Sequence, residues 1–332
     1  MPSWRLVLLK PLFAQRAAVP GAVPRGFLGG THELVHWLLM IQVTEEQVRE
    51  HLSMEECVRI MRQTFEALRK GTASNQPRRR IYLDNGTTLH SMGGVYGKYF
   101  GTKFYSTNPK HGAYFFFFLF DSETARPLAQ FEANYLGQIR TGAASGYATD
   151  LLAVPGSVTL GVIGSGFQAQ SQIDAIRCVR DVKEIRVWSR KQEKREAFAA
   201  ANQARAVTTA EEAVRGADIV VTATPSKDPV LEDSWIVPGV HVNAMGSNRE
   251  QRRELPSRLV HRADLIAVDS IEVAKIEAGD LIMAPVDWND RRIVDLAKIE
   301  QRPAGKPLTI FKSCGLGVED VAAAAYVYER LV

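Results

Sequence analysis

Residues 158–170 read Val-Thr-Leu-Gly-Val-Ile-Gly-Ser-Gly-Phe-Gln-Ala-Gln, and this stretch decides the fold. It begins with an apolar, β-branched run, which predicts a buried parallel strand. A glycine turn at 164–166 follows, and a helical pattern then extends from Phe167 to about Val179. A strand, a glycine turn and a helix in this order are the context that a dinucleotide-binding fingerprint requires. The sequence therefore predicts a nucleotide cofactor at this turn.

Each small residue of this fingerprint has its own physical role. Gly164 permits the tight turn, Gly166 lets the backbone approach a pyrophosphate, and Ala169 lets helix and strand pack closely. The anion then meets free backbone N–H groups at the positive end of the helix dipole. We expect the cofactor to contact the residues of this turn, namely Gly164, Ser165, Gly166, Phe167, Gln168 and Ala169.

The composition is that of an ordinary soluble enzyme. The chain has 332 residues, of which 45% are hydrophobic and 23% charged, and its length suggests about two domains. A net charge of +4 gives no basis for a nucleic-acid partner. The three cysteines are widely spaced, so neither a disulfide framework nor a metal site is indicated. No apolar run reaches the length of a membrane span, and we expect a cytoplasmic protein without a membrane partner.

The pattern divides the chain into an extension and two domains. Residues 1–39 are basic and contain no acidic residue before Glu33, so they are either a targeting segment or an upstream extension, poorly packed in both cases. Residues 40–131 are expected to form a small α+β substrate-binding and dimerisation domain. Residues 132–307 are expected to form an α/β domain with a Rossmann-type parallel sheet. Residues 308–332 are expected to return to the first domain.

The first domain shows clear helix and strand signals. Thr44-Glu45-Glu46-Gln47 resembles a capping box, and Ser53 opens an amphipathic helix that Gly71 can end. A β-rich stretch follows, in which Gly93-Gly94 is expected to be one of the turns. We expect strands at 81–83, 87–92, 101–106 and 114–120. A helix over 132–153 is rich in small residues, which allow another backbone or a flat ligand to approach closely.

The end of the second strand of the parallel sheet indicates which cofactor binds. Ligands of such sheets lie beyond the carboxyl ends of the strands, which places Ser189, Thr224 and Asn248 on one rim with Gly164. The segment Trp188-Ser189-Arg190-Lys191 lacks the carboxylate that binds the adenosine ribose hydroxyls. A serine and an arginine suit a 2′-phosphate instead, so Ser189, Arg190 and Lys191 predict NADP(H) rather than NAD(H). A solvent-exposed basic turn is the alternative.

Three cations outside the nucleotide fingerprint are candidates for binding a substrate. They are Arg79, Lys103 and Arg140. Each could be a solvated charge, and a triple-arginine run such as residues 78–80 usually is. Lys103 is harder to explain in this way, because it lies inside an otherwise apolar strand.

Five motifs in order make the chain similar to a known family. They are Gln-Pro-Arg-Arg-Arg (76–80), Gly-Thr-Lys (101–103), Ile-Arg-Thr-Gly-Ala-Ala-Ser (139–145), Gly-Ser-Gly-Phe-Gln-Ala (164–169) and Asn-Ala-Met-Gly-Ser-Asn (243–248). Over about residues 40–332 the chain resembles the ornithine cyclodeaminase/mu-crystallin family. That resemblance implies a homodimer with a Rossmann domain and a second domain that binds the substrate and pairs the subunits. Members include ornithine cyclodeaminases, cyclic ketimine reductases, alanine dehydrogenases and a hormone-binding crystallin.

The resemblance also implies roles for individual residues. Arg79, Lys103 and Arg140 would hold the substrate carboxylate, because a planar carboxylate suits a guanidinium fork within a positive cluster. Its neighbouring C2 could then be held over the nicotinamide ring for hydride transfer. The expected cofactor contacts on this side are Thr141, Thr224, Met245 and Ser247.

Two positions depart from the cyclodeaminase pattern. Asn248 stands where the cyclodeaminases have an aspartate, and His90 stands where they have a glutamate. Closing the ornithine ring requires a base near a second, cationic amine, and a neutral amide cannot act as that base. We therefore expect a cyclic ketimine such as pyrroline-2-carboxylate, with Lys103, Arg140, His90 and Asn248 as the catalytic set. His90 could relay the imine proton or serve only as a hydrogen-bonded structural histidine.

Two other functions remain open from the sequence. One is an ornithine cyclodeaminase or alanine dehydrogenase that uses NAD. The other is a cofactor-dependent binding protein without turnover, because function resides in the site rather than in the fold.

Overall fold

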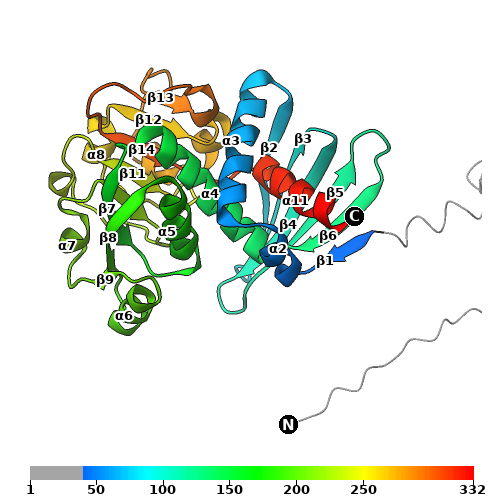
Figure 1. The fold of residues 1–332 in the computed structure, drawn as a ribbon, viewed down its shortest axis with the longest axis horizontal. Coiled ribbons are helices and arrows are strands. Elements are labelled where there is room, and N and C mark those ends of the chain that lie inside the picture. The colour runs from blue at the N-terminus through cyan, green and yellow to red at the C-terminus, as the bar shows by residue number, and fades with distance from the viewer. Residues whose placement is uncertain (1–39) are drawn as a thin grey trace, which may run out of the picture. The chain divides into compact units, whose positions relative to one another are not determined.

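Two β-sheets organise residues 40–332, the part of the chain that this computed structural model describes (Figure 1). The expectation that residues 1–39 are poorly packed lies outside the described residues. The first sheet lies at one end of this unit and the second at the other, with helices between them (Figure 1). The α/β fold class predicted from the sequence is confirmed.

The first sheet is mixed and has six strands within residues 40–332. Its order is β1-β6-β5-β4-β3-β2, in which only β1 and β6 pair in parallel. The strands are β1 (Ile41–Val43), β2 (Ala73–Tyr82), β3 (Thr88–Tyr96), β4 (Tyr99–Asn108), β5 (Gly112–Asp121) and β6 (Pro127–Glu132).

The helices α2 (Glu45–His51) and α3 (Met54–Lys70) begin and end where the sequence indicated. The Thr44 side chain accepts a hydrogen bond from the backbone N–H of Gln47, whose side chain accepts one from Thr44 in return, as a capping box requires. The Ser53 side chain caps α3 by accepting a hydrogen bond from the backbone N–H of Glu56, and Gly71 ends the helix with a left-handed φ of 71°. These local signals set where the two helices begin and where α3 ends.

The second sheet is wholly parallel and has eight strands in the described part of the chain. Its order is β13-β12-β14-β11-β10-β7-β8-β9. The strands are β7 (Ser157–Ile163), β8 (Asp181–Trp188), β9 (Arg205–Ala206), β10 (Ile219–Thr222), β11 (His241–Ala244), β12 (Leu265–Val268), β13 (Ile293–Asp295) and β14 (Thr309–Lys312). The helices that accompany them are α5 (Phe167–Val179), α6 (Gln192–Ala201), α7 (Ala210–Val214), α8 (Ser257–Arg262), α9 (Ile271–Glu277) and α10 (Gly279–Ile282), with short 3₁₀ helices η2 (Asp233–Trp235) and η3 (Leu296–Lys298).

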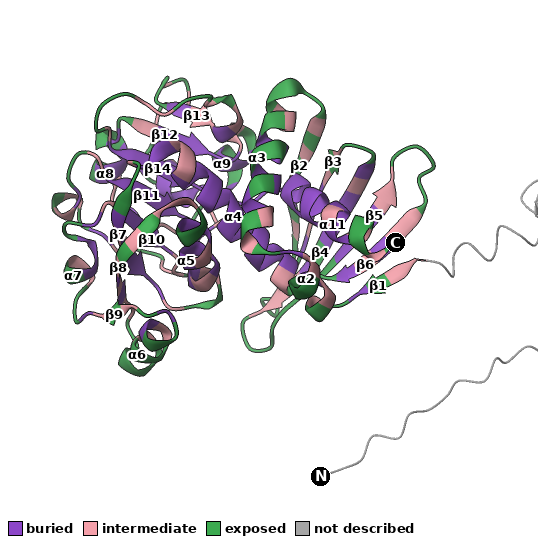
Figure 2. Cartoon of the chain, in the orientation of Figure 1, coloured by how far each residue is buried: buried purple, intermediate pink, exposed green. Residues whose placement is uncertain are grey.

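Helix α4 (Asn134–Leu152) joins the two sheets, and it is buried along nearly its whole length (Figure 2). Its small residues allow the close approach that the sequence predicted. A Cβ atom at Gly142 would lie 2.3 Å from the backbone oxygen of Ser171 in α5, so only glycine fits there. Gly146 faces Ala175 of α5 and Val58 of α3 in the same manner. The backbone contact of α4 with α5 therefore depends on glycine.

The C-terminal segment differs from the prediction that residues 308–332 return together to the first domain. Strand β14 lies between β11 and β12 in the second sheet, with which it pairs in parallel. Only the last helix, α11 (Gly317–Leu331), packs against the first sheet (Figure 1). Strand β14 is buried and apolar, so it joins the core of the parallel sheet, and the chain crosses to the first sheet only after this strand.

Two predicted details of the first sheet are wrong for physical reasons. Gly93 and Gly94 do not form a turn but lie inside β3, where α11 begins directly above them. A Cβ atom at Gly94 would lie 2.6 Å from the Cα atom of Val318. The second error is at Pro77, which lies inside β2 rather than before a strand that starts at Ile81. The register shifts there, as is usual for a proline within a sheet.

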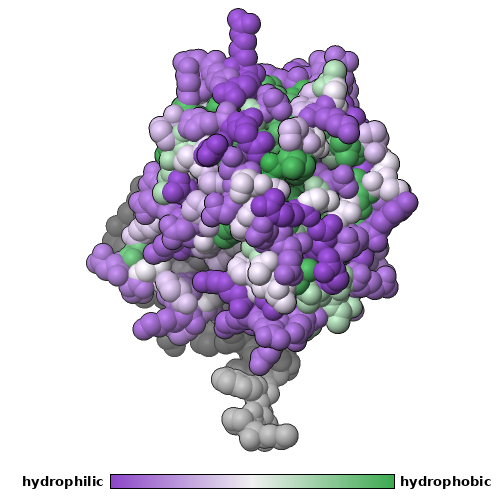
Figure 3. Space-filling model, turned by 90° about the vertical axis from the view of Figure 1, so that its left-hand side faces the viewer, coloured by the Kyte–Doolittle hydropathy of each residue, from purple (hydrophilic) through white to green (hydrophobic). Residues whose placement is uncertain are grey.

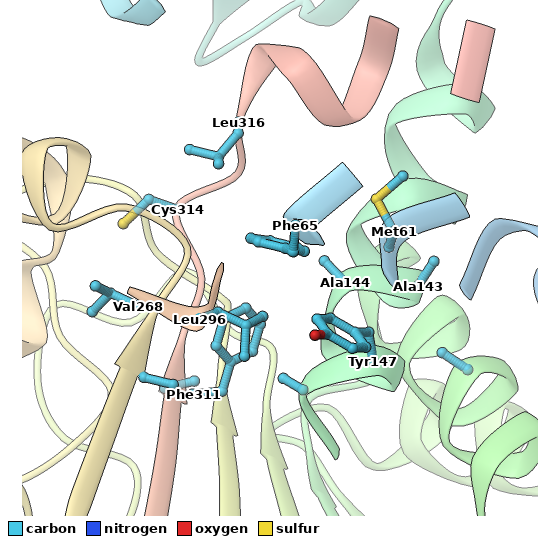
Figure 4. Close-up of a cluster of buried hydrophobic side chains, with 14 of the residues drawn as sticks. Met61, Phe65, Ala143, Ala144, Tyr147, Val268, Leu296, Phe311, Cys314 and Leu316 are labelled. Atoms are coloured by element: carbon cyan, nitrogen blue, oxygen red, sulfur yellow. The ribbon is translucent and has the colours of Figure 1, made fainter. Parts of the chain in front are cut away.

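A hydrophobic core connects the two sheets (Figure 4). Phe65 of α3 and Tyr147 of α4 stack with their ring centroids 5.7 Å apart on one side, and Val268 and Phe311 of the second sheet lie on the other. Phe65 and Phe311 are fully buried, and each such side chain contributes roughly 1.5–3 kcal/mol relative to exposure. The shared core holds the facing edges of the two sheets in place.

The surface at the end of the second sheet is mainly hydrophilic, with apolar residues scattered over it (Figure 3). Within residues 40–332, no helix combines the length and the apolar character needed to cross a membrane.

Candidate active site

A cavity of about 420 Å³ lies between the inner face of the first sheet, helix α4 and the carboxyl ends of the second sheet's strands. We call it the cationic cavity. The charged residues that line it are Arg78, Lys103, Arg140 and Arg249, and no aspartate or glutamate of residues 40–332 is among its lining residues. Its apolar and aromatic walls include Met92, Tyr105, Phe115, Phe167 and Met245.

Lys103 reaches this cavity from the inner face of β4. It is 3% exposed, and its Nζ atom lies 2.9 Å from Oδ1 of Asp320 on α11. A Cβ atom at Gly137 would lie 2.4 Å from that Nζ atom, so the lysine occupies space that only a glycine on α4 leaves open. The presence of a lysine inside an apolar strand is thus explained, because the whole Lys103 side chain is buried against α4 and α11.

Arg140 lies about one helical turn beyond Gly137 on α4, and therefore on the same face of the helix. Its Nη1 atom lies 2.7 Å from Oε2 of Glu319, and its Nε atom lies 3.3 Å from the same Asp320 oxygen that binds Lys103. A Cβ atom at Gly315 would lie 2.6 Å from Nη1, and Gly315 has a left-handed φ of 80°. The structure therefore brings Lys103 and Arg140 together at one carboxylate.

The third cation in the cavity wall is Arg78, whereas the predicted Arg79 is exposed and does not line the cavity. Pro77 and Arg78 together oppose the single residue Met92 of β3, so the bulge turns Arg78 inward and leaves Arg79 exposed. Arg78 Nη2 donates to the backbone oxygen of Cys314 at 3.1 Å and of Gly315 at 3.4 Å, next to Arg140. A one-residue change of register exchanges the two faces of a strand.

Three buried carboxylates that balance these cations were not predicted. Glu319 and Asp320 lie on α11, and Glu277 of α9 pairs with Arg78 and, at 2.6 Å, with Arg80. The signal for the first two was present, because they are adjacent acidic residues inside the otherwise apolar run 316–325. Glu277 carried no such signal, since α9 is an ordinary mixed helix.

Burial shifts the pKa values of this cluster. It lowers the pKa of the Lys103 ammonium to about 8, although Asp320 acts in the opposite direction. It raises the pKa of the Glu319 carboxyl to about 7 against the effect of Arg140. Burial alone would raise the pKa of Asp320 as well, but Arg140 and Lys103 bring it below its ordinary value. Lys103 and Arg140 are therefore charged at neutral pH, with Asp320 as their fixed counter-ion.

His90 lines the cavity from β3 and is 3% exposed. Its Nε2 atom lies 3.1 Å from Oγ1 of Thr107, and its ring stacks on Tyr105 with centroids 4.1 Å apart. Burial, assisted by Arg80, Arg78 and Arg249, lowers the pKa of His90 to about 3, so the ring is neutral. Its Nδ1 atom is buried and has no hydrogen-bond partner in the described part of the chain.

Asn248 lines the cavity from the loop after β11. Two cations, the half-buried Arg80 and the buried Lys312, hold this loop. Arg80 Nη2 donates to the Asn248 backbone oxygen at 3.0 Å, and Lys312 Nζ donates to that of Ser247 at 2.6 Å. Met245 and Thr141 also line the cavity, as predicted for the cofactor side. Ser247 does not line it but is buried within the loop.

A second hollow, of about 590 Å³, lies at the carboxyl end of β7 and is called here the glycine-turn groove. Gly164, Ser165 and Gly166 line it together with Thr224. Gly164 has a left-handed φ of 124°, and a Cβ atom there would lie 2.5 Å from the Ala223 oxygen. In the part of the chain that the structure describes, nothing lies within 4 Å of a Cβ atom at Gly166, and no side chain caps α5. The backbone is thus bare at the N-terminus of α5, as an approaching phosphate requires.

The basic end of β8 forms another wall of the groove. Ser189, Arg190, Lys191 and Lys194 line it, and the Ser189 hydroxyl accepts a hydrogen bond from Ser165 Oγ at 2.8 Å. Ala169, by contrast, is fully buried and does not reach the groove, because it packs helix α5 on the sheet. Its predicted packing role therefore agrees with the structure, and Ala169 is not among the residues that line the groove.

A buried carboxylate joins the strand ends that border both hollows. Glu254 accepts hydrogen bonds from the backbone N–H groups of Thr224 and Gly246, both at 2.7 Å, and from the Thr222 hydroxyl at 3.0 Å. Phe167 and Gln168 lie in the cavity wall directly after the glycine turn, so cavity and groove meet at this turn. A dinucleotide in the groove can therefore direct its nicotinamide end toward the cations.

Comparisons with known proteins agree with this geometry. The model of the ornithine cyclodeaminase/mu-crystallin family matches residues 39–332. The ketimine reductase mu-crystallin of Mus musculus is 38% identical over 216 residues, which cover 64% of this chain and 67% of the relative. The Delta(1)-pyrroline-2-carboxylate reductase of Bacillus cereus (strain ZK / E33L) is 39% identical over 229 residues, which cover 64% and 70%.

Solved structures show the same fold. The Delta(1)-pyrroline-2-carboxylate reductase of Thermococcus litoralis, solved with NADH and L-proline, has a TM-score of 0.82 at 29% identity and covers 88% of this chain and 97% of its own. An archaeal alanine dehydrogenase dimer with bound NAD also has a TM-score of 0.82, at 30% identity, and covers 87% and 95%. A nicotinamide cofactor is therefore indicated for the fold that this chain adopts.

Proposed function

Because the chain belongs to the ornithine cyclodeaminase/mu-crystallin family, we propose that it is an oxidoreductase that reduces a cyclic ketimine or other α-imino acid, such as pyrroline-2-carboxylate, to the amino acid. The observation that carries this proposal is the cationic cavity, in which Arg78, Lys103 and Arg140 meet and whose lining within residues 40–332 includes no acidic residue. Such a site accepts a carboxylate, and its described lining offers no carboxylate side chain to a substrate ammonium.

Arg78, Lys103 and Arg140 act on the substrate by position and charge. A carboxylate between them gains charge-assisted hydrogen bonds, which places C2 and its C=N bond at the Phe167–Gln168 side of the cavity. The nicotinamide, when bound, supplies the hydride. Glu319 and Asp320 hold the two cations of β4 and α4 in place and prevent their mutual repulsion.

The imine nitrogen must gain a proton, and Lys103 is the better source of it. An ammonium with a pKa of about 8 is protonated at neutral pH and can still release its proton. His90 has a pKa of about 3, so it is not protonated and can only relay a proton or donate one N–H. We therefore assign His90 to orienting the substrate together with Thr107 and Asn248.

We further propose NADP(H) as the preferred cofactor. A 2′-phosphate in the glycine-turn groove would meet the Ser189 hydroxyl and the three cations Arg190, Lys191 and Lys194. A guanidinium binds phosphate in a bidentate manner. Within residues 40–332 no carboxylate lines this groove, so the feature that selects NAD(H) is missing from the described lining.

The proposed homodimer uses the outer face of the first sheet. Leu89, Phe104, Tyr114 and Phe116 lie on three neighbouring strands and are each 40–62% exposed. An apolar surface of this kind on a sheet is a common interface between subunits. Light scattering of the purified chain tests this assignment: twice the monomer mass is expected, and Phe104→Glu should shift the mass toward the monomer.

The function is tested by adding pyrroline-2-carboxylate and NADPH to the purified protein and following NADPH oxidation. Turnover is expected, and Lys103→Gln should lower kcat/KM by about 10²-fold, the loss that one hydrogen-bonded charge accounts for. If the cofactor is not oxidised with any member of a panel of cyclic and open-chain imino acids, the reductase assignment fails. NAD-dependent ammonia release from ornithine would instead identify a cyclodeaminase.

A further inference from the structure

Helices α4 and α5 each carry one half of the proposed active site. Helix α4 bears Arg140, and its Gly137 leaves the space that the Lys103 ammonium occupies. Helix α5 begins directly after the glycine turn, and its first residues, Phe167 and Gln168, lie in the cavity wall. In the proposed reaction the substrate carboxylate is therefore held from α4, and the cofactor is held from the N-terminus of α5.

The two helices meet along a seam of contacts that repeats once per helical turn. Its contacts, at every fourth residue of both helices, are Gln138 with Phe167, Gly142 with Ser171, and Gly146 with Ala175. A Cβ atom at Gly142 would lie 2.3 Å from the Ser171 backbone oxygen. One at Gly146 would lie 3.0 Å from the Cβ atom of Ala175. The two glycines thus bring the helices close together, but they supply no side-chain hydrogen bond between them.

Gln138 supplies that hydrogen bond, at the end of the seam next to the cationic cavity. The residue is 7% exposed, and its Nε2 atom donates to the backbone oxygen of Phe167. Among residues 134–152 and 167–179, all of which the structure describes, this is the only side-chain hydrogen bond that links α4 to α5. Because a hydrogen bond is directional, it fixes the position of one helix relative to the other.

Gln138 acts at a distance from both ligand sites. Its neighbours Gly137, Arg140 and Thr141 line the cationic cavity, whereas Gln138 is not among the described lining residues of the cavity or of the glycine-turn groove. Its partner Phe167 is the first residue of α5 and lies in the cavity wall. A change at Gln138 therefore reaches the ligands only through the placement of the two helices.

We propose that Gln138 is a positioning residue that aligns the substrate cations of α4 with the cofactor turn of α5, and that it makes the binding of cofactor and imino acid cooperative. This inference rests on the proposed function, since it concerns how the two sites of that reaction act together. The substrate ring must lie against the nicotinamide, so the ternary complex depends on the relative placement of the helices. Each binary complex depends on one site alone.

The test measures cooperativity with a flat mimic of the ketimine that cannot be reduced. Calorimetry compares the Kd of pyrrole-2-carboxylate without NADPH and with saturating NADPH, and the ratio of these Kd values is the coupling factor. We expect a coupling factor of about ten in the wild type. Gln138→Met keeps the length of the side chain but removes the N–H donor, and it should lower the factor about threefold or more, which is the share of one hydrogen bond.

The binary complexes distinguish positioning from a general loss of structure. In Gln138→Met, the Kd of NADPH alone and the Kd of the mimic alone should each change less than about twofold, because Gln138 lies outside both linings. Gln138→Leu should lower the coupling factor in the same way, so the result does not depend on the folding of a single variant.

Gln172→Met is the matched control, because it makes the same substitution at a fully buried glutamine of α5 whose side-chain amide has no hydrogen-bond partner in the described part of the chain. It should keep the wild-type coupling factor. The inference is overturned if the wild type shows no cooperativity, if both Gln138 variants keep the wild-type factor, or if Gln172→Met lowers it equally. The binding comparison needs no turnover, so failure to reduce pyrroline-2-carboxylate would count against the proposed function alone.

Discussion

The glycine-turn groove and the cationic cavity are neighbours, but they are built in opposite ways. The groove is formed by three short segments between Gly164 and Val230, each at the carboxyl end of a strand, and the side chains of Arg190 and Lys191 are exposed to solvent. The cavity is formed by ion pairs between residues 179 to 217 positions apart, all of them buried. A site made from local backbone keeps its shape when one side chain changes. A site made from buried charges depends on each partner, because removing one leaves the other buried without a counter-ion.

The largest expected effect separates two adjacent arginines. Arg78→Ala removes a side chain that is 3% exposed and leaves Glu277 with Arg80 as its remaining partner, so we expect a loss of about 3–5 kcal/mol in the free energy of unfolding. Arg79→Ala removes an exposed side chain and should change it by no more than about 0.5 kcal/mol. Urea unfolding of both variants measures the difference. Equal effects would contradict the inward position of Arg78.

A pair of glycines tests whether the groove is made of backbone. Gly164→Ala forces a residue with a Cβ atom into a left-handed conformation against the Ala223 oxygen, and should cost about 1–3 kcal/mol of stability. Gly166→Ala has open space around its Cβ atom and an ordinary φ of −94°, so it should fold normally. It should nevertheless raise KM for NADPH about tenfold, because the methyl group occupies the approach of the pyrophosphate. Thermal unfolding and cofactor titration separate the two effects. An unchanged KM for NADPH in Gly166→Ala would contradict the assignment of the pyrophosphate to this turn.

The pH dependence of stability tests the charge balance of the cavity. The pKa of Glu319 is about 7 in the folded protein, against 4.5 as its ordinary value, so the folded state binds the extra proton between these values. The stability that this proton confers is complete below pH 4.5 and is lost as the pH rises through about 7. Between pH 5 and pH 8 the wild type should therefore lose on the order of 1–3 kcal/mol relative to Glu319→Gln. Parallel curves for the two proteins would mean that Glu319 is already ionised at pH 5.

The smallest expected effect lies at the exposed side of the groove. Arg190→Ala should lower kcat/KM with NADPH about tenfold and should change kcat/KM with NADH less than about twofold, because only the former carries a 2′-phosphate. Steady-state kinetics with both cofactors measures the ratio. An equal loss with both would assign Arg190 to the shared part of the nucleotide.

The two regions also differ in how far they could be predicted. The groove follows from residues 158–170 and 188–191, since strand, turn and helix signals act over a few residues. The caps at Thr44 and Ser53 were readable for the same reason. The family resemblance indicated that Lys103 and Arg140 belong to one cluster, and in the structure both contact Asp320. For Lys103 the sequence carried a signal of its own, because a charge inside an apolar strand needs a buried partner. Their partners Glu319 and Asp320 were not connected to them, since sequence spacing contains no information about which helix packs on which strand.

What residues 158–170 settle is the presence of a parallel sheet with a nucleotide turn, because hydrophobic period and glycine placement are local properties of the chain. Which arginine of the run 78–80 points into the cavity was decided by packing instead. The bulge at Pro77 exists only when β2 pairs with β3, and that bulge chooses Arg78 over Arg79. In the same way, Gly93 and Gly94 became strand residues only because α11 presses on them. Pairing and close approach are relations between distant segments, and they arise only once the chain has folded.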